Sequence, residues 1–242
     1  FFSFNSEFAK FQNLKLITPN SQFITDLSMR YPKEGFRNFY DDVSIDAVVQ
    51  DSFMGLEDFQ LLVPNVFASE TINLDQLNFS GSPSDYSIDS IRLNYKKSNF
   101  FGSFNFNSRS SSKLTIQELS INPKDIQTLF PTLEESSVDI LNRFGKANIS
   151  GTLASQSANH KLNLSLDSSL GPLQFNFDFF RKRKQINPFY DGQIRASQFN
   201  IGKLLNQPDL GTANLSLYMQ GKGLQFDQLD TRLYGQFSSF SY

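Results

Sequence analysis

The stretch Leu173-Gln-Phe-Asn-Phe-Asp-Phe179 places an apolar side chain at every second position. The same alternation occurs in Leu162-Asn-Leu-Ser-Leu166 and in Leu215-Ser-Leu-Tyr-Met219. Successive side chains of a β-strand point to opposite faces of the sheet, so a period of two predicts strands with one apolar and one polar face. We therefore expect an all-β chain of antiparallel strands. Further alternating stretches lie at residues 23–29, 43–49, 91–95 and 149–153.

Turns and a few short helices are expected between these strands. Clusters of Gly, Pro, Ser and Asp predict turns at residues 81–83, 168–172 and 190–192. Apolar residues three and four positions apart predict short helices at 123–130 and 137–144, and a third after a helix cap at Asn200. The helical content should therefore be small.

An internal repeat organises the chain. The stretches Gly55–Pro64, Asn122–Pro131 and Asn200–Pro208 read alike, each as a short helical turn that ends in proline. A glycine-containing strand follows each one, and its glycines lie 70 residues apart in both intervals. Such spacing predicts about three repeated units within one continuous segment, residues 1–242. The three glycines are Gly81, Gly151 and Gly221, and the expected units are residues 47–112, 119–180 and 196–242.

Composition excludes several functions. The 22 basic and 24 acidic residues leave a formal charge of only −2, which provides no field to attract nucleic acid. The chain has 27 Phe but no Cys, so Cys-ligated zinc, disulfides and thiol nucleophiles are all excluded. We expect no nucleic-acid partner, no cofactor and no metal.

Few residues suggest catalysis. His160 is the single histidine and is expected at a strand edge, although a Ser-His-Asp arrangement around it is an open alternative. The pairs Asp41-Asp42 and Glu134-Glu135 are expected in solvated loops, because they lack companion ligands at metal-site spacing. Gly221-Lys222-Gly223 is expected as a turn, and Arg181-Lys-Arg-Lys184 as a basic hairpin tip or a contact for lipid phosphate. We do not expect an enzyme.

An apolar sheet face must be covered by a second sheet, closed as a barrel, or left as the lining of a groove. Repetition favours an elongated stack, and about 15 strands would extend on the order of 70 Å. A trough lined by Phe and Leu could hold an acyl chain. An ordinary sandwich core is the alternative. The residues expected to line the groove are Ile149, Leu153, Leu162, Leu164, Leu166, Leu173, Phe175, Phe177, Leu215, Leu217 and Met219.

A set of ordered motifs resembles the TamB family, named for the translocation and assembly module subunit, in the form found in the Bacteroidota. The resemblance covers essentially the whole chain and depends on the order of many weak motifs. That family belongs to the AsmA-like group of bridge-like lipid transfer proteins. The motifs are Asp26–Tyr31, Asp41–Ile45, Leu56–Phe59, Gly145–Leu153, Asn200–Gly223 and Leu229–Tyr242.

The resemblance implies a curved, U-shaped, taco-like β-sheet whose hydrophobic groove conducts phospholipid through the periplasm between inner and outer membrane. It also implies an N-terminal inner-membrane anchor and an Omp85-family barrel as outer-membrane partner, both contacted through parts outside this chain. We expect an internal fragment of the N-terminal half, because the chain begins at Phe1 without Met and still alternates up to Tyr242.

Two other functions stay open at this stage. One is a scaffold or chaperone-like surface for assembly of outer-membrane proteins, an activity that the same resemblance suggests. The other is an enzyme or adhesin on a closed sandwich. The first predicts contacts with unfolded barrel strands, and the second predicts a filled core between two sheets.

Overall fold

The computed structural model describes residues 1–33, 37–59, 69–181, 187–223 and 230–239. The chain forms two compact units, Phe1–Leu133 and Glu134–Tyr242. Across the described residues the fold is an all-β antiparallel meander with a few short helices, which confirms the expected fold class at this level. None of the helices in the described part of the chain is long and apolar enough to cross a membrane.

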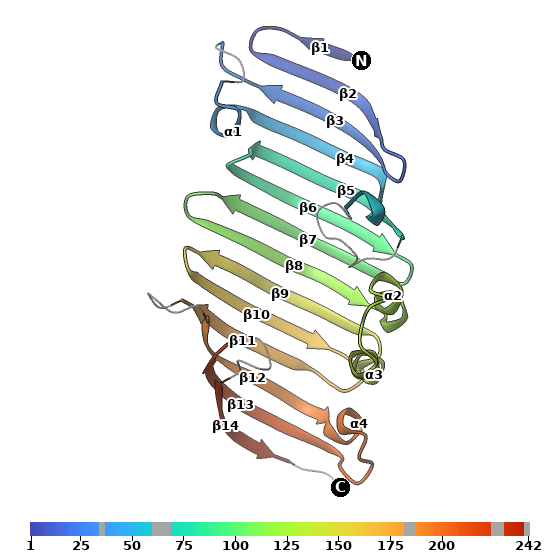
Figure 1. Ribbon diagram of the computed structural model, residues 1–242, viewed down its shortest axis with the longest axis vertical. Helices are drawn as coiled ribbons and strands as arrows, with labels where there is room; N and C mark the ends of the chain where they lie inside the picture. The colour runs from blue at the N-terminus through green and yellow to red at the C-terminus, as the bar shows by residue number, and fades with distance from the viewer. Residues whose placement is uncertain (34–36, 60–68, 182–186, 224–229, 240–242) are drawn as a thin grey trace. The chain divides into compact units, whose positions relative to one another are not determined.

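The first unit contains eight strands that follow one another in chain order (Figure 1). Each pairs antiparallel with its neighbours in the sequence. The strands are β1 (Phe2–Phe4), β2 (Phe8–Ile17), β3 (Gln22–Arg30), β4 (Ser44–Gly55), β5 (Thr71–Ser82), β6 (Asp85–Tyr95), β7 (Ser98–Asn107) and β8 (Ser111–Ile121). The helices are α1 (Phe39–Asp42), the 3₁₀ turn η1 (Leu56–Phe59) and α2 (Pro123–Leu129).

The second unit repeats this arrangement with six strands. Its strands also pair antiparallel with their sequence neighbours. They are β9 (Ala147–Gln156), β10 (Asn159–Asp167), β11 (Leu173–Phe180), β12 (Phe189–Asn200), β13 (Thr212–Lys222) and β14 (Asp230–Ser238). Its helices are α3 (Glu135–Phe144) and α4 (Ile201–Leu205), which lie side by side at one end of the strands (Figure 1).

The strand order is open. Among the described residues no ladder joins the first strand of either unit to its last, and the antiparallel meander is not closed or strongly curled. The helices predicted at 123–130, at 137–144 and after Asn200 are confirmed as α2, α3 and α4. Asn200 caps α4, since its side chain accepts a hydrogen bond from the Lys203 amide.

In the first unit, η1 follows β4 and α2 follows β8, and each is hydrogen-bonded to the turn region of an earlier hairpin. Asp58 in η1 accepts hydrogen bonds from the hydroxyls of Thr18 and Ser21, in the turn between β2 and β3. Asp125 in α2 accepts from the Lys97 amide in the turn between β6 and β7 and from the Ser98 hydroxyl at the start of β7, both at 2.8 Å. We call these contacts the first and second clasps.

The second unit has a third clasp of the same kind. The Lys203 ammonium group in α4 donates a hydrogen bond of 2.9 Å to the Ser169 hydroxyl, in the turn between β10 and β11. The clasps therefore follow β4, β8 and β12, at intervals of four strands. This order of elements agrees with a repeat that begins at each short helix, while the expected unit boundaries stay a prediction.

Three predicted turns need correction. Residues Tyr190–Gly192 lie inside β12, because Gly192 provides space for an aromatic ring from β11: a Cβ atom there would lie 2.3 Å from the Phe177 ring. Gly81 and Ser82 lie in β5, so the turn begins only at Pro83. Gly221 and Lys222 are the last residues of β13, which continues pairing with β14.

Some predicted features lie outside the described residues. These are the proline that ends the first helical turn, Pro64, most of the basic run after Arg181, the start of the last motif at Leu229, and the chain end from residue 240 to 242.

Candidate functional site: the apolar face of the second unit

All eleven predicted lining residues lie on one face of the second unit's sheet. Leu164 pairs with Phe175, and Ile194 pairs with both Phe175 and Leu217, so the apolar side chains continue across neighbouring strands in register. Paired residues in an antiparallel sheet share a face. This pairing places the eleven residues, which come from four strands, on one face. Their role as a groove lining stays a prediction.

The pairing arranges this face in three apolar rows that run across the strands. We name them by their distance from helices α3 and α4. The helix-side row is Ile149, Leu166, Leu173, Ala196, Leu215 and Phe237. The middle row is Gly151, Leu164, Phe175, Ile194, Leu217 and Gly235. The outer row is Leu153, Leu162, Phe177, Gly192, Met219 and Leu233.

Aromatic rings lie flat on this face where a glycine stands opposite. Phe177 covers Gly192, and Tyr190 covers Gly221, where an added Cβ atom would lie 2.8 Å from the Tyr190 ring carbon Cζ. The ring of Phe179 lies between them, with centroid distances of 6.0 Å to Phe177 and 6.3 Å to Tyr190. Glycine without a Cβ therefore lets aromatic side chains extend the apolar surface over the backbone.

Most of this face is only partly buried. Of the eleven residues only Leu173 is buried, at 7% exposed, whereas Leu153 is 43% exposed and the others are half-buried. On β14, Leu233 is 58% exposed. A filled sandwich core would bury such side chains almost completely. The described residues therefore provide no second sheet over this face.

Helices α3 and α4 cover one end of the face. Leu170 and Phe199 are 1% and 2% exposed and form a core cluster with Leu173 and Ala196. Partly buried residues pack against that cluster from α3 and α4 and from the strands. They are Phe144, Leu166, Phe175, Ile194, Ile201, Leu204 and Leu215.

The two helices are also fixed by hydrogen bonds. The Arg143 guanidinium donates to the Leu204 carbonyl at 2.6 Å, and the Ser169 amide donates to the Phe144 carbonyl at 3.0 Å. The end of the face beside α3 and α4 is therefore a small, well-packed core, and the remainder of the face is uncovered.

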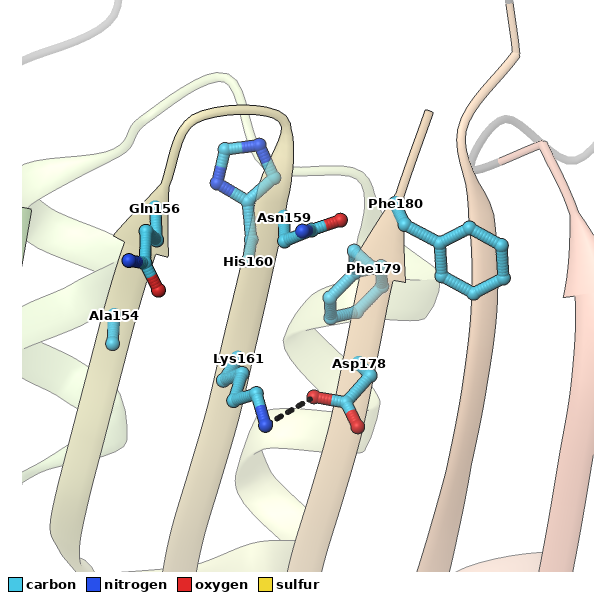
Figure 2. A pocket seen from close by; sticks show the side chains of 8 residues that line it. All are labelled: Ala154, Gln156, Asn159, His160, Lys161, Asp178, Phe179 and Phe180. Carbon is cyan, nitrogen blue, oxygen red and sulfur yellow. Dashed lines mark ion pairs between the residues drawn. The ribbon is translucent and has the colours of Figure 1, made fainter. Parts of the chain in front are cut away.

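The opposite face carries polar side chains that bond to one another across strands. Lys161 pairs with Asp178 at 3.7 Å, and Figure 2 shows this ion pair on the face shared by Ala154. The Tyr218 hydroxyl donates to the Asp191 carboxylate, and this bond raises the pKa of Tyr218 to about 12. These side chains stabilise the sheet, and they make its second face polar.

Figure 2 also shows a shallow hollow at the strand ends farthest from α3 and α4. It encloses about 280 Å³. Its polar wall comes from Lys161 and Asp178, together with Gln156 and Asn159. The volume is small for a ligand site and the walls are exposed, so the hollow itself indicates no substrate.

His160 lies at the start of β10, at an exposed position as expected. Its Nδ1 atom lies 2.7 Å from the Ser155 hydroxyl oxygen. Within the described residues no carboxylate bonds to either member of this pair, so the third member of a Ser-His-Asp arrangement is missing there.

The acidic pairs do not form a ligand cluster. Asp41 and Asp42 end helix α1 instead of lying in a loop, and Asp41 accepts from the Ser84 hydroxyl at 2.6 Å. Glu134 is the N-cap residue of α3 and Glu135 is its first residue, because α3 starts two residues earlier than its apolar spacing predicted. The described ranges contain no group of three or more metal-ligating side chains.

The predicted lining residues omitted the apolar side chains of two strands. On β12, Ile194 and Ala196 complete the middle and helix-side rows, and on β14, Leu233 and Phe237 extend the outer and helix-side rows. The alternation Gly192-Gln-Ile-Arg-Ala196 was the available signal, but the glycine was interpreted as a turn.

The first unit has a comparable apolar face. One of its rows connects Ala47, Phe79, Ile88, Phe104 and Leu114 through successive pairs from β4 to β8. In this unit sequence alternation predicted one-sided strands at residues 23–29, 43–49 and 91–95, which lie largely in β3, β4 and β6.

Comparisons with known proteins provide no name: no family model, no curated protein and no solved structure matches the chain. The resemblance to the TamB family therefore depends on the sequence motifs alone.

Proposed function

We propose that the apolar face of the second unit binds phospholipid acyl chains and that the protein is a lipid conduit without catalytic activity. The apolar rows provide a surface along which acyl chains can move from strand to strand.

The observation that carries the proposal is an apolar face that is in register over six strands and still half-exposed. Contiguous exposed apolar surface on a soluble protein usually marks an interaction site. A surface without hydrogen-bond donors at its centre suits a ligand that has none, and an acyl chain is such a ligand.

The energetics favour a weakly held, mobile ligand. Each methylene removed from water contributes about 0.8 kcal/mol when it is fully buried. A chain lying on an open sheet is covered from one side only, so it gains part of that value at every position. No single residue dominates, and the chain can therefore shift along the face at low cost.

We further propose the wider setting that the sequence resemblance suggests. In this proposal both units belong to an elongated, curved groove of about three repeats in a bridge-like lipid transfer protein of the TamB family. The groove carries phospholipid through the periplasm between inner and outer membrane. An inner-membrane anchor and an Omp85-family barrel would act through other parts of the protein.

Site-specific photo-crosslinking tests the lipid contact. A photoreactive amino acid at Leu164, Phe175 or Leu217 should capture phospholipid when the purified full chain is mixed with vesicles of phosphatidylethanolamine and phosphatidylglycerol. The same probe at Ser165, Asn176 or Ser216, one residue along each strand and on the polar face, should not. Equal capture from both faces would contradict the proposal. Capture of unfolded barrel strands from cell extracts instead of lipid would favour the assembly scaffold.

A matched pair of charge substitutions tests function in the intact protein. Leu217→Asp places a carboxylate in the middle row between Ile194 and Gly235 and should abolish most lipid capture from Phe175. Ser216→Asp places the same carboxylate opposite Arg195 on the polar face and should leave capture unchanged. The proposal is wrong if both variants lose capture equally while both remain folded by circular dichroism.

A further inference from the structure

A fourth row of the second unit's apolar face differs chemically from the other three. It lies beyond the outer row, at the strand ends farthest from α3 and α4, and we call it the rim row. The Ser155 hydroxyl and His160 Nδ1 lie 2.7 Å apart in it, and the Tyr190 and Thr231 hydroxyls bond to each other. This face therefore becomes polar at its rim. The row is Ser155, His160, Phe179, Tyr190, Gly221 and Thr231.

The other end of the same face is apolar, and α3 and α4 pack against it over β10 to β13. Phe144 of α3 and Leu204 of α4 pack against the cluster around Phe199, which is 2% exposed. A polar group placed at that end would lose water without gaining a partner. The two ends of the face along its strands therefore differ: one is a polar rim at which His160 is exposed, and the other is apolar and covered by helices.

The length of the face along a strand fits one acyl chain. Six residues separate the rim row from the helix-side row on β10, from His160 to Leu166. At about 3.3 Å per residue this is roughly 20 Å. One leaflet of a bilayer contributes about half of a 30 Å hydrocarbon core, so its acyl chains are about 15 Å long. A chain that ends against α3 and α4 would therefore place its ester group between the outer row and the rim row.

We propose that phospholipid binds this face with its acyl chains parallel to the strands. The terminal methyl groups contact the helix-side row and Leu204, and the glycerophosphate headgroup lies at the rim row. The Ser155–His160 pair and the Thr231 hydroxyl offer hydrogen bonds to the phosphate there, and the exposed side chain of Arg181 follows the end of β11. This inference rests on the proposed lipid-binding function and gives the bound lipid a direction across the strands.

Two photoreactive phospholipids test the orientation. One carries a diazirine at the end of an acyl chain, and the other carries it beside the glycerol. Each is added in phosphatidylglycerol vesicles to the purified full chain, and the labelled residues are located by mass spectrometry. The tail probe should label Leu166, Leu215 and Leu204, and the glycerol-side probe should label Phe179 and His160.

The outcomes separate this inference from the function on which it rests. A reversed pattern, or an equal spread of both probes over all four rows, would overturn the orientation while leaving acyl-chain binding intact. Absence of labelling on the apolar face with either probe would overturn acyl-chain binding and the orientation together.

A double variant tests the rim itself. Ser155→Ala with His160→Phe removes two polar side chains from the rim row without disturbing the three apolar rows. The ratio of glycerol-side to tail labelling at Phe179 should fall about fivefold, the change expected for one lost hydrogen bond. Total labelling should stay constant. Asn159→Ala, one residue away on the polar face, is the matched control, and an unchanged ratio in the double variant would overturn the role of the rim.

Discussion

The second and third clasps occupy the same place in the repeat but use opposite charges. Asp125 stands three residues after the cap Asn122, and Lys203 stands three residues after the cap Asn200. Asp125 accepts hydrogen bonds from its hairpin turn, whereas Lys203 donates one to its turn. The recurring feature is the contact between a short helix and the preceding hairpin. The helix residue that makes this contact is acidic in the second clasp and basic in the third.

Burial explains how the two clasps differ. Asp125 is only 5% exposed and satisfies a backbone amide, so its carboxylate is part of the structure of α2 and the β6–β7 turn. Lys203 is exposed, and the core cluster around Phe199 lies beside it. We infer that the second clasp is held by a polar contact and the third by apolar packing.

The largest expected effect comes from breaking the apolar packing of the third clasp. Phe199→Ala removes a ring that is 2% exposed and packs 6.4 Å from the ring of Phe144. The free energy of unfolding should fall by about 3–5 kcal/mol, measured by urea denaturation. Phe237→Ala removes a ring that is 60% exposed and should cost within about 0.5 kcal/mol. Equal losses in the two variants would contradict the assignment of the core to this end.

The second prediction breaks the polar clasp. Asp125→Ala leaves the Lys97 amide and the Ser98 hydroxyl without their acceptor and should cost about 1–3 kcal/mol. Asp125→Asn retains one acceptor oxygen and should cost less. Lys124→Ala changes the exposed neighbour in the same helix and should be close to neutral. Urea denaturation monitored by circular dichroism compares the three, and a neutral Asp125→Ala would show that the clasp contributes nothing.

Features of the fold that depend only on local sequence could be predicted. The face assignments were predictable because side-chain direction in a strand depends only on position along the chain, as in Leu162-Asn-Leu-Ser-Leu166. The cap predicted at Asn200 is equally local, since its side chain bonds within its own first turn, as that of Asn122 also does in α2. Local patterns of this kind predicted strands and the helices α2 and α4.

Features that depend on distant partners were not predictable in the same way. Gly192 was interpreted as a turn, because the Phe177 ring that covers it belongs to another strand. The clasps join residues such as Lys97 and Asp125 that are 28 positions apart, and neither residue alone signals the contact. Whether the apolar face is covered likewise depends on where α3 and α4 pack, which alternation within a strand does not specify.

The first clasp allows the polar mechanism to be tested by pH. Hydrogen bonds from Ser21 and Thr18 hold the pKa of Asp58 below its usual value of 3.8, because they stabilise the carboxylate. A depressed folded pKa adds stability above the unfolded pKa of about 3.9, and this stability is lost as pH falls through the folded value.

The measurement compares wild type with Asp58→Asn in thermal melts from pH 7 to pH 3. Wild type should be more stable at pH 7, and the difference should shrink as pH falls below about 4. Asp46→Asn removes an exposed carboxylate on β4 and serves as the control for loss of charge. A difference that stays constant with pH would mean that the Asp58 charge does not stabilise the clasp.

The smallest effect is expected at the polar bond of the third clasp. Lys203→Ala removes the hydrogen bond to Ser169 but leaves the Lys203 amide bonded to the Asn200 cap. Because an exposed ammonium group exchanges this bond for water, the free energy of unfolding should change by at most about 0.5 kcal/mol. Lys146→Ala, at another exposed lysine of the same unit, is the reference in the urea denaturation series. A loss of unfolding free energy as large as that of Asp125→Ala would mean that a polar contact holds the third clasp as it holds the second. The two clasps would then differ only in the sign of the charged residue.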